Sequence, residues 1–223
     1  MNIAIIVAAG SGKRFGGNIP KQFTDIHGKP LLIHTLEKFE NCPAIDEIVL
    51  VLSADGIPYF KHISDDHSFD KLKNLVKGGE SRAESVFAGI SSLNCAAEDI
   101  IAVHDGARPL VTSAEISETI EKAKETGAAC LVGKMNDTVK RTSHGQIVDT
   151  LDRADLRRAF TPQCFRFEIL NRAFQKSALS ESVTDECSLV ENLGIEISFV
   201  DGSSNNIKIT TPEDVKIAEL FLQ

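Results

Sequence analysis

Short apolar runs alternate with amphipathic stretches along almost the whole chain, and this alternation constrains the fold more than any other feature. The apolar runs, typical of buried strands, are Ile3–Val7, Ile48–Leu52, Leu75–Lys77, Ile100–Val103, Cys130–Val132 and Glu196–Val200. Apolar residues at helical spacing predict helices over residues 32–39, 82–93 and 113–123, and over Phe165–Leu179, Glu186–Leu193 and Pro212–Leu222. This order predicts an α/β protein with a doubly wound, mostly parallel sheet and helices on both faces.

The composition is that of one globular domain spanning residues 1–223, with 42% hydrophobic and 25% charged residues. The net charge of −8 argues against a nucleic-acid or membrane partner, but it allows a small phosphorylated ligand in a local cationic pocket. The five cysteines include no Cys-x-x-Cys pair, and no secretory signal precedes the first strand. We therefore expect a cytoplasmic protein with free thiols.

One segment, residues 136–152, breaks the alternation. Here β-prone residues flank Ser143-His144-Gly145, a pattern that predicts a hairpin. The segment is too polar for a core strand pair, so we expect it to project from the body. An isolated two-stranded ribbon is barely stable alone, which favours an arm that embraces a second subunit.

A glycine-rich loop, Ala8-Ala9-Gly10-Ser11-Gly12-Lys13-Arg14, follows the first strand. Such a loop lies at the edge of the sheet where ligands bind, and its glycines let N–H groups converge on an anion. Arg14 stands where a P-loop needs Ser or Thr, and Phe15 stands where the dinucleotide fingerprint needs Gly. The loop, with Lys21 downstream, suits a triphosphate. The alternative is an ordinary glycine-rich turn with solvated cations.

In this loop and in later motifs, the chain resembles the cytidylyltransferases that act on 2-C-methyl-D-erythritol 4-phosphate in the non-mevalonate isoprenoid pathway. The later motifs follow in the family's order: Gly78-Gly79-Glu80-Ser81-Arg82-Ala83-Glu84-Ser85-Val86, His104-Asp105-Gly106-Ala107-Arg108-Pro109, Asp137-Thr138-Val139-Lys140, Leu151-Asp152-Arg153, Thr161-Pro162-Gln163, Thr184-Asp185-Glu186 and Asn206-Ile207-Lys208-Ile209-Thr210. The resemblance implies a Rossmann-like nucleotidyltransferase fold, with the hairpin as the dimerisation arm of a homodimer. It also implies transfer of a cytidylyl group from CTP to a small sugar-alcohol phosphate, with release of pyrophosphate.

The resemblance also implies roles for single residues. Arg14 and Lys21 would hold the triphosphate, while Lys208 would bridge the α-phosphate and the acceptor. The nucleotide pocket would be formed by Ala8, Ala9, Gly10, Gly12, Gly79, Glu80 and Ser85. The acceptor would be bound by Arg108, Thr138, Arg153 and Thr161, with Thr138 and Arg153 reaching the site of the neighbouring subunit. Asp105 ends a strand at the ligand edge and would hold Mg²⁺, which prefers oxygen ligands and substrate phosphates.

Plainer interpretations exist for several of these residues. Glu80 and Ser85 suit the capping of a helix N-terminus, and Asp105 suits a helix or turn cap. Arg153 could form an ion pair with a neighbouring aspartate, and Arg82 could pair with a nearby carboxylate. His104 is interpreted as structural, because the reaction requires no proton to be removed.

Two other functions remain open from the sequence. The ribitol 5-phosphate cytidylyltransferases share much of this framework and differ in the acceptor. A nucleotide-binding regulator without catalysis is disfavoured, because Arg14, Lys21, Asp105 and Lys208 are all present. Departures from the family pattern, such as Asn205 where some members carry Asp, lie near the expected acceptor and metal regions. The nucleotide is therefore better supported than the acceptor.

Overall fold

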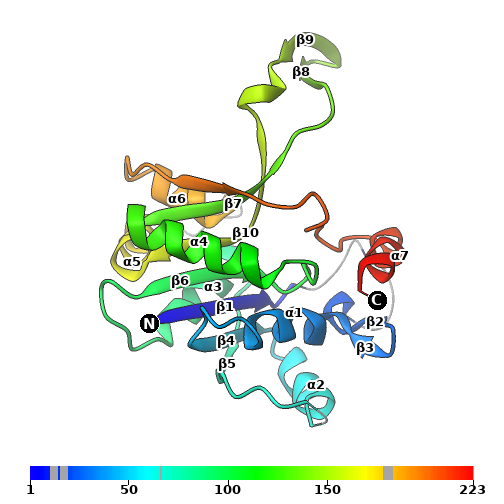
Figure 1. Ribbon diagram of the computed structural model, residues 1–223, viewed down its shortest axis with the longest axis vertical. Helices are drawn as coiled ribbons and strands as arrows, with labels where there is room; N and C mark the ends of the chain where they lie inside the picture. Colours follow the sequence, from blue (N-terminus) through cyan, green and yellow to red (C-terminus); the bar gives the residue numbers. More distant parts are fainter. Residues whose placement is uncertain (11–14, 16–19, 66, 178–182, 223) are drawn as a thin grey trace.

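A computed structural model describes residues 1–10, 15, 20–65, 67–177 and 183–222. Seven strands form one sheet in the order β11-β7-β10-β6-β1-β4-β5 (Figure 1). Their bounds are β1 Asn2–Ala8, β4 Glu47–Leu52, β5 Leu72–Lys77, β6 Ile100–Asp105, β7 Ala128–Lys134, β10 Arg157–Arg166 and β11 Ser198–Asp201. β10 is antiparallel to both of its neighbours, and the other strand pairs are parallel. The predicted mostly parallel sheet is confirmed.

Helices cover both faces of this sheet, as the alternation predicts (Figure 1). The even positions of β1, such as Ile6, pack with α1 (Leu31–Glu40) and α4 (Ser113–Thr126). The odd positions, such as Ile5, pack with α3 (Arg82–Ser91), α5 (Phe167–Lys176) and α6 (Glu186–Glu191). Alternate side chains of a strand point to opposite faces, so one apolar run supplies both core layers. No helix in the described ranges is long and apolar enough to cross a membrane.

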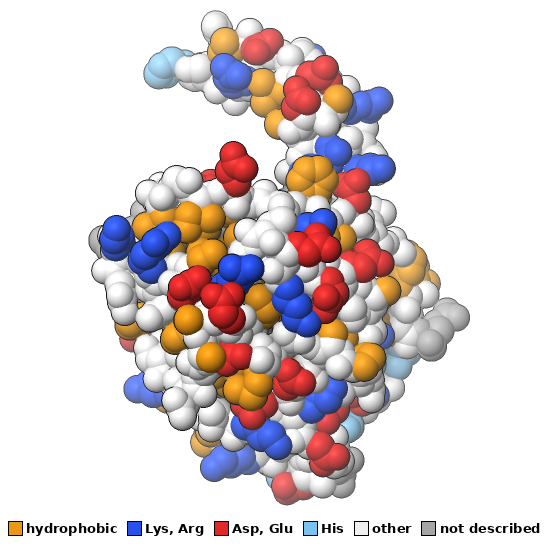
Figure 2. Space-filling view, turned by 60° about the vertical axis from the view of Figure 1, so that its left-hand side comes forward, with side chains coloured by type: hydrophobic (Ala, Val, Ile, Leu, Met, Phe, Trp, Pro, Cys, Tyr) orange, Lys and Arg blue, Asp and Glu red, His pale blue; other side chains and the backbone are white. Residues whose placement is uncertain are grey.

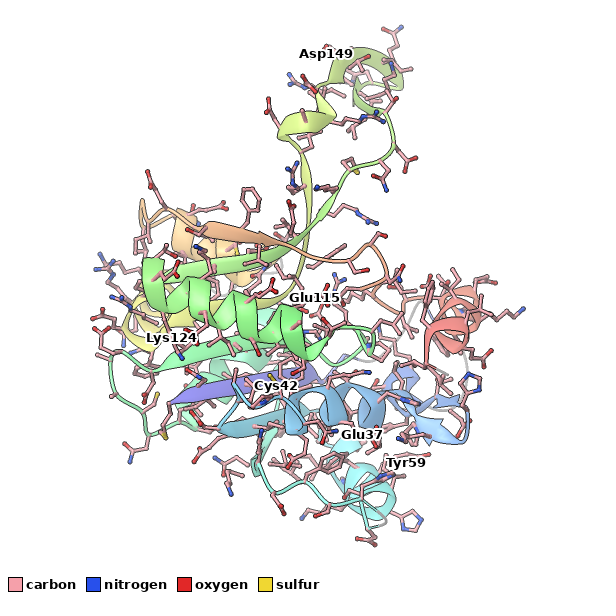
Figure 3. All side chains as sticks on the ribbon, in the orientation of Figure 1. Glu37, Cys42, Tyr59, Glu115, Lys124 and Asp149 are labelled. Carbon is pink, nitrogen blue, oxygen red and sulfur yellow. The ribbon has the colours of Figure 1, made fainter. Side chains whose placement is uncertain are left out.

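Several short elements lie outside the main sheet and its covering helices. A short two-stranded sheet, β2 (Asp25–Ile26) with β3 (Lys29–Pro30), packs against α7 (Pro212–Phe221). The 3-10 turn η1 (Lys21–Phe23) precedes it, and η2 (Arg153–Asp155) follows the hairpin. Glu115, labelled in Figure 3, lies at the start of α4. It accepts a hydrogen bond from the backbone N–H of Ser203 at 2.7 Å and so fixes the loop after β11.

One strand of the main sheet and one α-helix were not predicted. β10 continues through Arg166, where the sequence pattern indicated a helix from Phe165. Its buried polar residues, Thr161 and Gln163, and its proline hide the alternation typical of a strand. The helix α2 (Gly56–Ile63) was missed because it contains Gly56 and Pro58. Pro58 lies in the first turn, where a helix does not need the N–H group that proline lacks.

The predicted hairpin is confirmed as β8 (Val139–Ser143) paired with β9 (Gln146–Leu151). His144 and Gly145 join the strands with φ of 50° and 77°, as a two-residue turn with positive φ at both positions requires. The hairpin stands clear of the body, and Asp149 lies far out on it (Figures 2 and 3). Near its tip, Ile147 and Val148 are 68% and 61% exposed.

Candidate active site

The order of the strands reverses between β1 and β6, and a cleft opens at the carboxyl ends of these strands. Ligands of open α/β sheets bind at such a switch point. The cleft contains a cavity of about 820 Å³ lined by the end of β1, the turn from β5 into α3, and Asp105. A smaller cavity of about 210 Å³ lies on the β10 side and includes Phe160, Thr161 and Thr184 in its lining. The two cavities share Arg82, Asp105 and Lys208, so they adjoin at these residues.

Asp105 is at the centre of this junction, and three cationic side chains surround its carboxylate. Its Oδ1 is 3.0 Å from Arg82 Nε, and its Oδ2 is 2.9 Å from Lys208 Nζ and 3.4 Å from Arg108 Nε. Burial alone would raise the pKa of Asp105, but the charges of Arg82, Lys208 and Arg108 outweigh it and hold the pKa well below its usual range. The carboxylate is therefore ionised near neutral pH.

The neighbouring His104 is fully buried and has a structural role. Its Nε2 lies 3.1 Å from the carbonyl oxygen of Arg108, to which only a protonated Nε2 can donate. Burial lowers the pKa of His104 to about 3, so the ring is neutral and Nδ1 accepts a bond from Thr161 Oγ1 at 3.0 Å. Thr161 Oγ1 in turn accepts a bond from the Asp105 backbone N–H at 3.1 Å. This chain of bonds fixes the backbone beneath the Asp105 carboxylate.

The wall of the larger cavity requires two residues without side chains. A Cβ at Gly78 would lie 2.6 Å from the Ala9 side chain and 2.7 Å from Ser85 Oγ. A Cβ at Gly79 would lie 2.5 Å from Glu84. The glycines thus let the start of α3 approach the end of β1, and Ala8, Ala9, Gly10, Gly79, Glu80 and Ser85 all line this cavity.

The N-terminus of α3 is capped by residues other than Glu80 and Ser85. Ser81 is the N-cap, and the Glu84 carboxylate accepts bonds from the backbone N–H groups of Glu80 and Ser81. Ser85 donates its hydroxyl to the Ser81 carbonyl at 2.9 Å. The Glu80 side chain is left exposed at the mouth of the cavity.

A second lysine reaches the cleft from η1. Lys21 lines the larger cavity, and its Nζ donates to the carbonyl of Ile209 at 3.0 Å, next to Lys208. Gln22, which is buried, donates to the carbonyl of Ala8 at 3.0 Å and fixes η1 to the end of β1. The sequence places these lysines far apart, and the fold brings them to one cavity.

Comparison with known proteins identifies the framework. The profile of the IspD family, 2-C-methyl-D-erythritol 4-phosphate cytidylyltransferase, matches residues 2–223. The chain belongs to this family. The family's protein from Clostridium novyi is 41% identical over 226 residues, covering 100% of this chain and 96% of that protein. The one from Clostridium perfringens is 39% identical, covering 99% and 98%.

Solved structures of the IspD family have the same fold. The crystal structure of 4-diphosphocytidyl-2C-methyl-D-erythritol synthase from Anaerococcus prevotii is 30% identical with a TM-score of 0.87, covering 100% of this chain and 96% of that one. The Francisella tularensis 2-C-methyl-D-erythritol 4-phosphate cytidylyltransferase is 34% identical with a TM-score of 0.83, covering 99% of both chains.

Some of the site residues expected from the IspD resemblance do not line the cavities of this chain. Lys21, Asp105, Arg108, Thr161 and Lys208 line the two cavities, whereas Thr138 and Arg153 line neither of them. Both lie at the base of the hairpin, where Arg153 Nη1 donates to the carbonyl of Asn136 at 2.6 Å. Arg14 and Gly12 fall outside the described residues.

The donor set at Asp105 fits a magnesium ion held mainly by its substrate. Within the described ranges, no three His, Cys, Asp or Glu side chains are grouped so that they could hold a metal. Mg²⁺ is commonly bound by one or two carboxylates together with substrate phosphates, so one buried, ionised aspartate at the junction of the cavities meets this need.

Sequence reasoning assigned no role at the site to two buried residues. Glu186 was interpreted as part of a helix turn, but its Oε1 is 2.6 Å from Arg82 Nη1. The N-cap of α6 is Asp185, whose side chain accepts a hydrogen bond from the backbone N–H of Ser188. The backbone carbonyl of Asn206 accepts a hydrogen bond from Arg108 Nη1, and the side-chain Nδ2 of Asn206 donates one to the backbone carbonyl of Thr161. Because Asn206 begins the Asn206–Thr210 motif, its position in the sequence could have indicated that it belongs to the site.

Proposed function

We propose that this chain transfers the cytidylyl group of CTP to 2-C-methyl-D-erythritol 4-phosphate, with CTP in the larger cavity and the acceptor in the smaller one. The products are 4-diphosphocytidyl-2-C-methyl-D-erythritol and pyrophosphate, in the non-mevalonate route to isoprenoids. The observation that carries this division is the cluster of Arg82, Arg108 and Lys208 around Asp105, where the two cavities adjoin.

The reaction brings one anion against another. An oxygen of the acceptor phosphate attacks the α-phosphorus of CTP, a P–O bond forms, and the bond to the β-phosphate oxygen breaks. The acceptor phosphate is already ionised near neutral pH, so no base is required. Positioning and charge stabilisation are what remains for the protein to supply. Lys208, at the junction, is suited to contact both the α-phosphate and the acceptor, while Lys21 and Arg14 hold the leaving pyrophosphate.

Asp105 is the residue that would hold Mg²⁺. The ion would neutralise charge on the triphosphate when bound. Lys208 and Arg108 hold the same carboxylate in this structure, so phosphates that enter would draw these cations toward themselves and free carboxylate oxygen. Activity should be lost in excess EDTA and return with Mg²⁺. Full turnover in EDTA would contradict this role of Asp105.

The hairpin is proposed as the arm of a homodimer. Thr138 and Arg153 lie at its base and away from both cavities of their own chain. Exposed Ile147 and Val148 give the arm apolar surface to bury against a second copy. In the dimer, the partner subunit's Arg153 would add a guanidinium, with its bidentate geometry, to the acceptor phosphate.

The substrate assignment is tested by pyrophosphate release. CTP with 2-C-methyl-D-erythritol 4-phosphate should support turnover, while UTP or ribitol 5-phosphate in the same place should support little. Equal rates with UTP would remove the cytosine assignment of the larger cavity. Preference for ribitol 5-phosphate would move the acceptor to the pentitol class and leave the nucleotide assignment intact.

The shared site is tested by mixing two inactive variants, Arg153→Ala and Lys208→Ala. If Arg153 acts in the partner's site, a mixed dimer has one site with both defects and one site with neither. Subunit exchange should then restore up to half of the wild-type activity per mixed dimer. If Arg153 acts within its own chain, every site keeps one defect and mixing restores nothing.

A further inference from the structure

Glu186 is a fully buried acid that no step of the proposed reaction uses. Its exposed fraction is 0%, and its Oε1 pairs with Arg82 Nη1 at 2.6 Å. Its Oε2 is buried and has no hydrogen-bond partner among the residues that the structure describes. Burying a carboxylate with one unpaired oxygen costs free energy of folding. If this position only filled space, an apolar side chain would be more stable there.

Arg82 connects this acid to the junction of the cavities. Its guanidinium contacts two carboxylates through different nitrogens: Nε binds Asp105 Oδ1 at 3.0 Å, and Nη1 binds Glu186 Oε1. The positive charge of Arg82 is thereby shared between the two carboxylates. The Oδ2 of Asp105 is left to Lys208 and Arg108.

The position of Glu186 is itself fixed from the sheet. Gln163 Oε1 on β10 accepts bonds from the backbone N–H groups of Glu186 and Cys187, both at 3.1 Å, while its Nε2 donates to Asp185 at 2.8 Å. The start of α6 is thereby tied to the strand that carries Thr161. The backbone of the residue that anchors Arg82 is therefore fixed to the sheet through Gln163.

We infer that Glu186 is a positioning residue for the transfer reaction: it shares the charge of Arg82, so that Asp105 stays oriented toward Lys208 at the junction of the two cavities. This inference rests on the proposed function. Without the Glu186 charge, Arg82 is attracted to Asp105 alone. It then draws the carboxylate away from Lys208 and from the incoming phosphates. The expected defect is in turnover, because the residues proposed to form the nucleotide pocket, such as Ala8 and Gly79, line other parts of the larger cavity.

The test compares Glu186→Gln with a matched control, Asp99→Asn. Both variants convert a buried, ion-paired carboxylate to an amide, but Asp99 pairs with the amino group of Met1 at the opposite end of β6 from Asp105. Glu186→Gln should lower kcat roughly ten- to a hundredfold with KM for CTP changed less than about threefold, since a charge-assisted contact is lost. Asp99→Asn should leave kcat at the wild-type value.

A double-mutant cycle separates positioning from loss of structure. In an Arg82→Gln background, adding Glu186→Gln should not lower kcat further, because Glu186 acts only through Arg82. The double variant leaves no unpaired charge between these two positions, so its kcat can be compared with that of the wild type if either single variant fails to fold. The inference is overturned if the losses in kcat of the two single variants multiply in the double variant. It is also overturned if Glu186→Gln has the wild-type kcat. An inactive wild-type chain would instead contradict the proposed function.

Discussion

Replacing Thr161 with valine removes the hydroxyl that joins Asp105 to His104 and leaves the shape of the side chain almost unchanged. In the structure, Thr161 Oγ1 accepts the backbone N–H of Asp105 at 3.1 Å and donates to His104 Nδ1 at 3.0 Å. All three residues are buried, at 4%, 7% and 0% exposure, so water cannot easily replace the lost hydroxyl.

The cost can be estimated from these two bonds. A buried polar group left without its partner costs about 1–3 kcal/mol, and Thr161→Val leaves two such groups. The sum is less than additive because both bonds meet at one oxygen, so we expect the free energy of unfolding to fall by about 2–4 kcal/mol. The control Thr161→Ser keeps the hydroxyl and loses one methyl group, at a cost of about 1 kcal/mol.

Urea unfolding followed by circular dichroism measures this difference, with pyrophosphate release as a second readout. The Thr161→Val variant should also lose turnover, because the backbone of Asp105 is no longer fixed, while Thr161→Ser should retain most of it. If valine and serine were equally stable within about 0.5 kcal/mol, the hydroxyl could not be holding Asp105 and His104 together, and the reasoning about this chain of bonds would be refuted.

Three more outcomes are expected. His104 has a folded pKa of about 3, below the unfolded value of about 6.5, so its contribution to stability is complete above pH 6.5 and is lost as the pH falls toward 3. Wild type should lose about 2–3 kcal/mol more between pH 7 and 4.5 than a folded His104→Gln variant, and equal slopes in urea unfolding would contradict the buried neutral ring. Gly78→Ala forces a Cβ to within 2.6 Å of the Ala9 side chain, which should lower the stability of this wall by about 1–3 kcal/mol. CTP binding, measured by calorimetry, should weaken roughly five- to a hundredfold. Unchanged CTP affinity would mean that the nucleotide does not contact this wall. Changing Ile147 and Val148 together to serine should shift sedimentation toward the monomer, and an unaltered dimer would show that the arm tip is not part of the interface.

The sheet and most of its helices could be predicted because the apolar pattern and the caps agree along the chain. The runs at Ile48–Leu52 and Ile100–Val103 are continuous and bounded by polar residues, as fully buried parallel strands are. β10 could not be predicted, because it carries site residues in place of a regular apolar pattern. Thr161 and Gln163 occupy buried positions where a strand pattern requires apolar side chains.

The candidate site was predictable only in part, for a related reason. Motifs reveal residue types at fixed spacing, and they pointed to Asp105, Lys208 and Lys21. Ion pairs between distant segments leave no such trace. Arg82 and Glu186 are 104 positions apart, and only the packing of α3 and α6 on one face of the sheet brings them together. The sequence suggested that Arg82 pairs with a carboxylate, but it could not say which.

The antiparallel strand β10 also determines the order in which the sheet can be completed. The neighbours of β7 in the sheet are β10 and β11, and both come after it in the chain. During synthesis, β1, β4, β5 and β6 can pair as soon as each emerges, but β7 has nothing to pair with until residues 157–166 have been made. The hairpin is synthesised in that interval. The hairpin is therefore synthesised before the strand that joins β7 and β11 to the rest of the sheet.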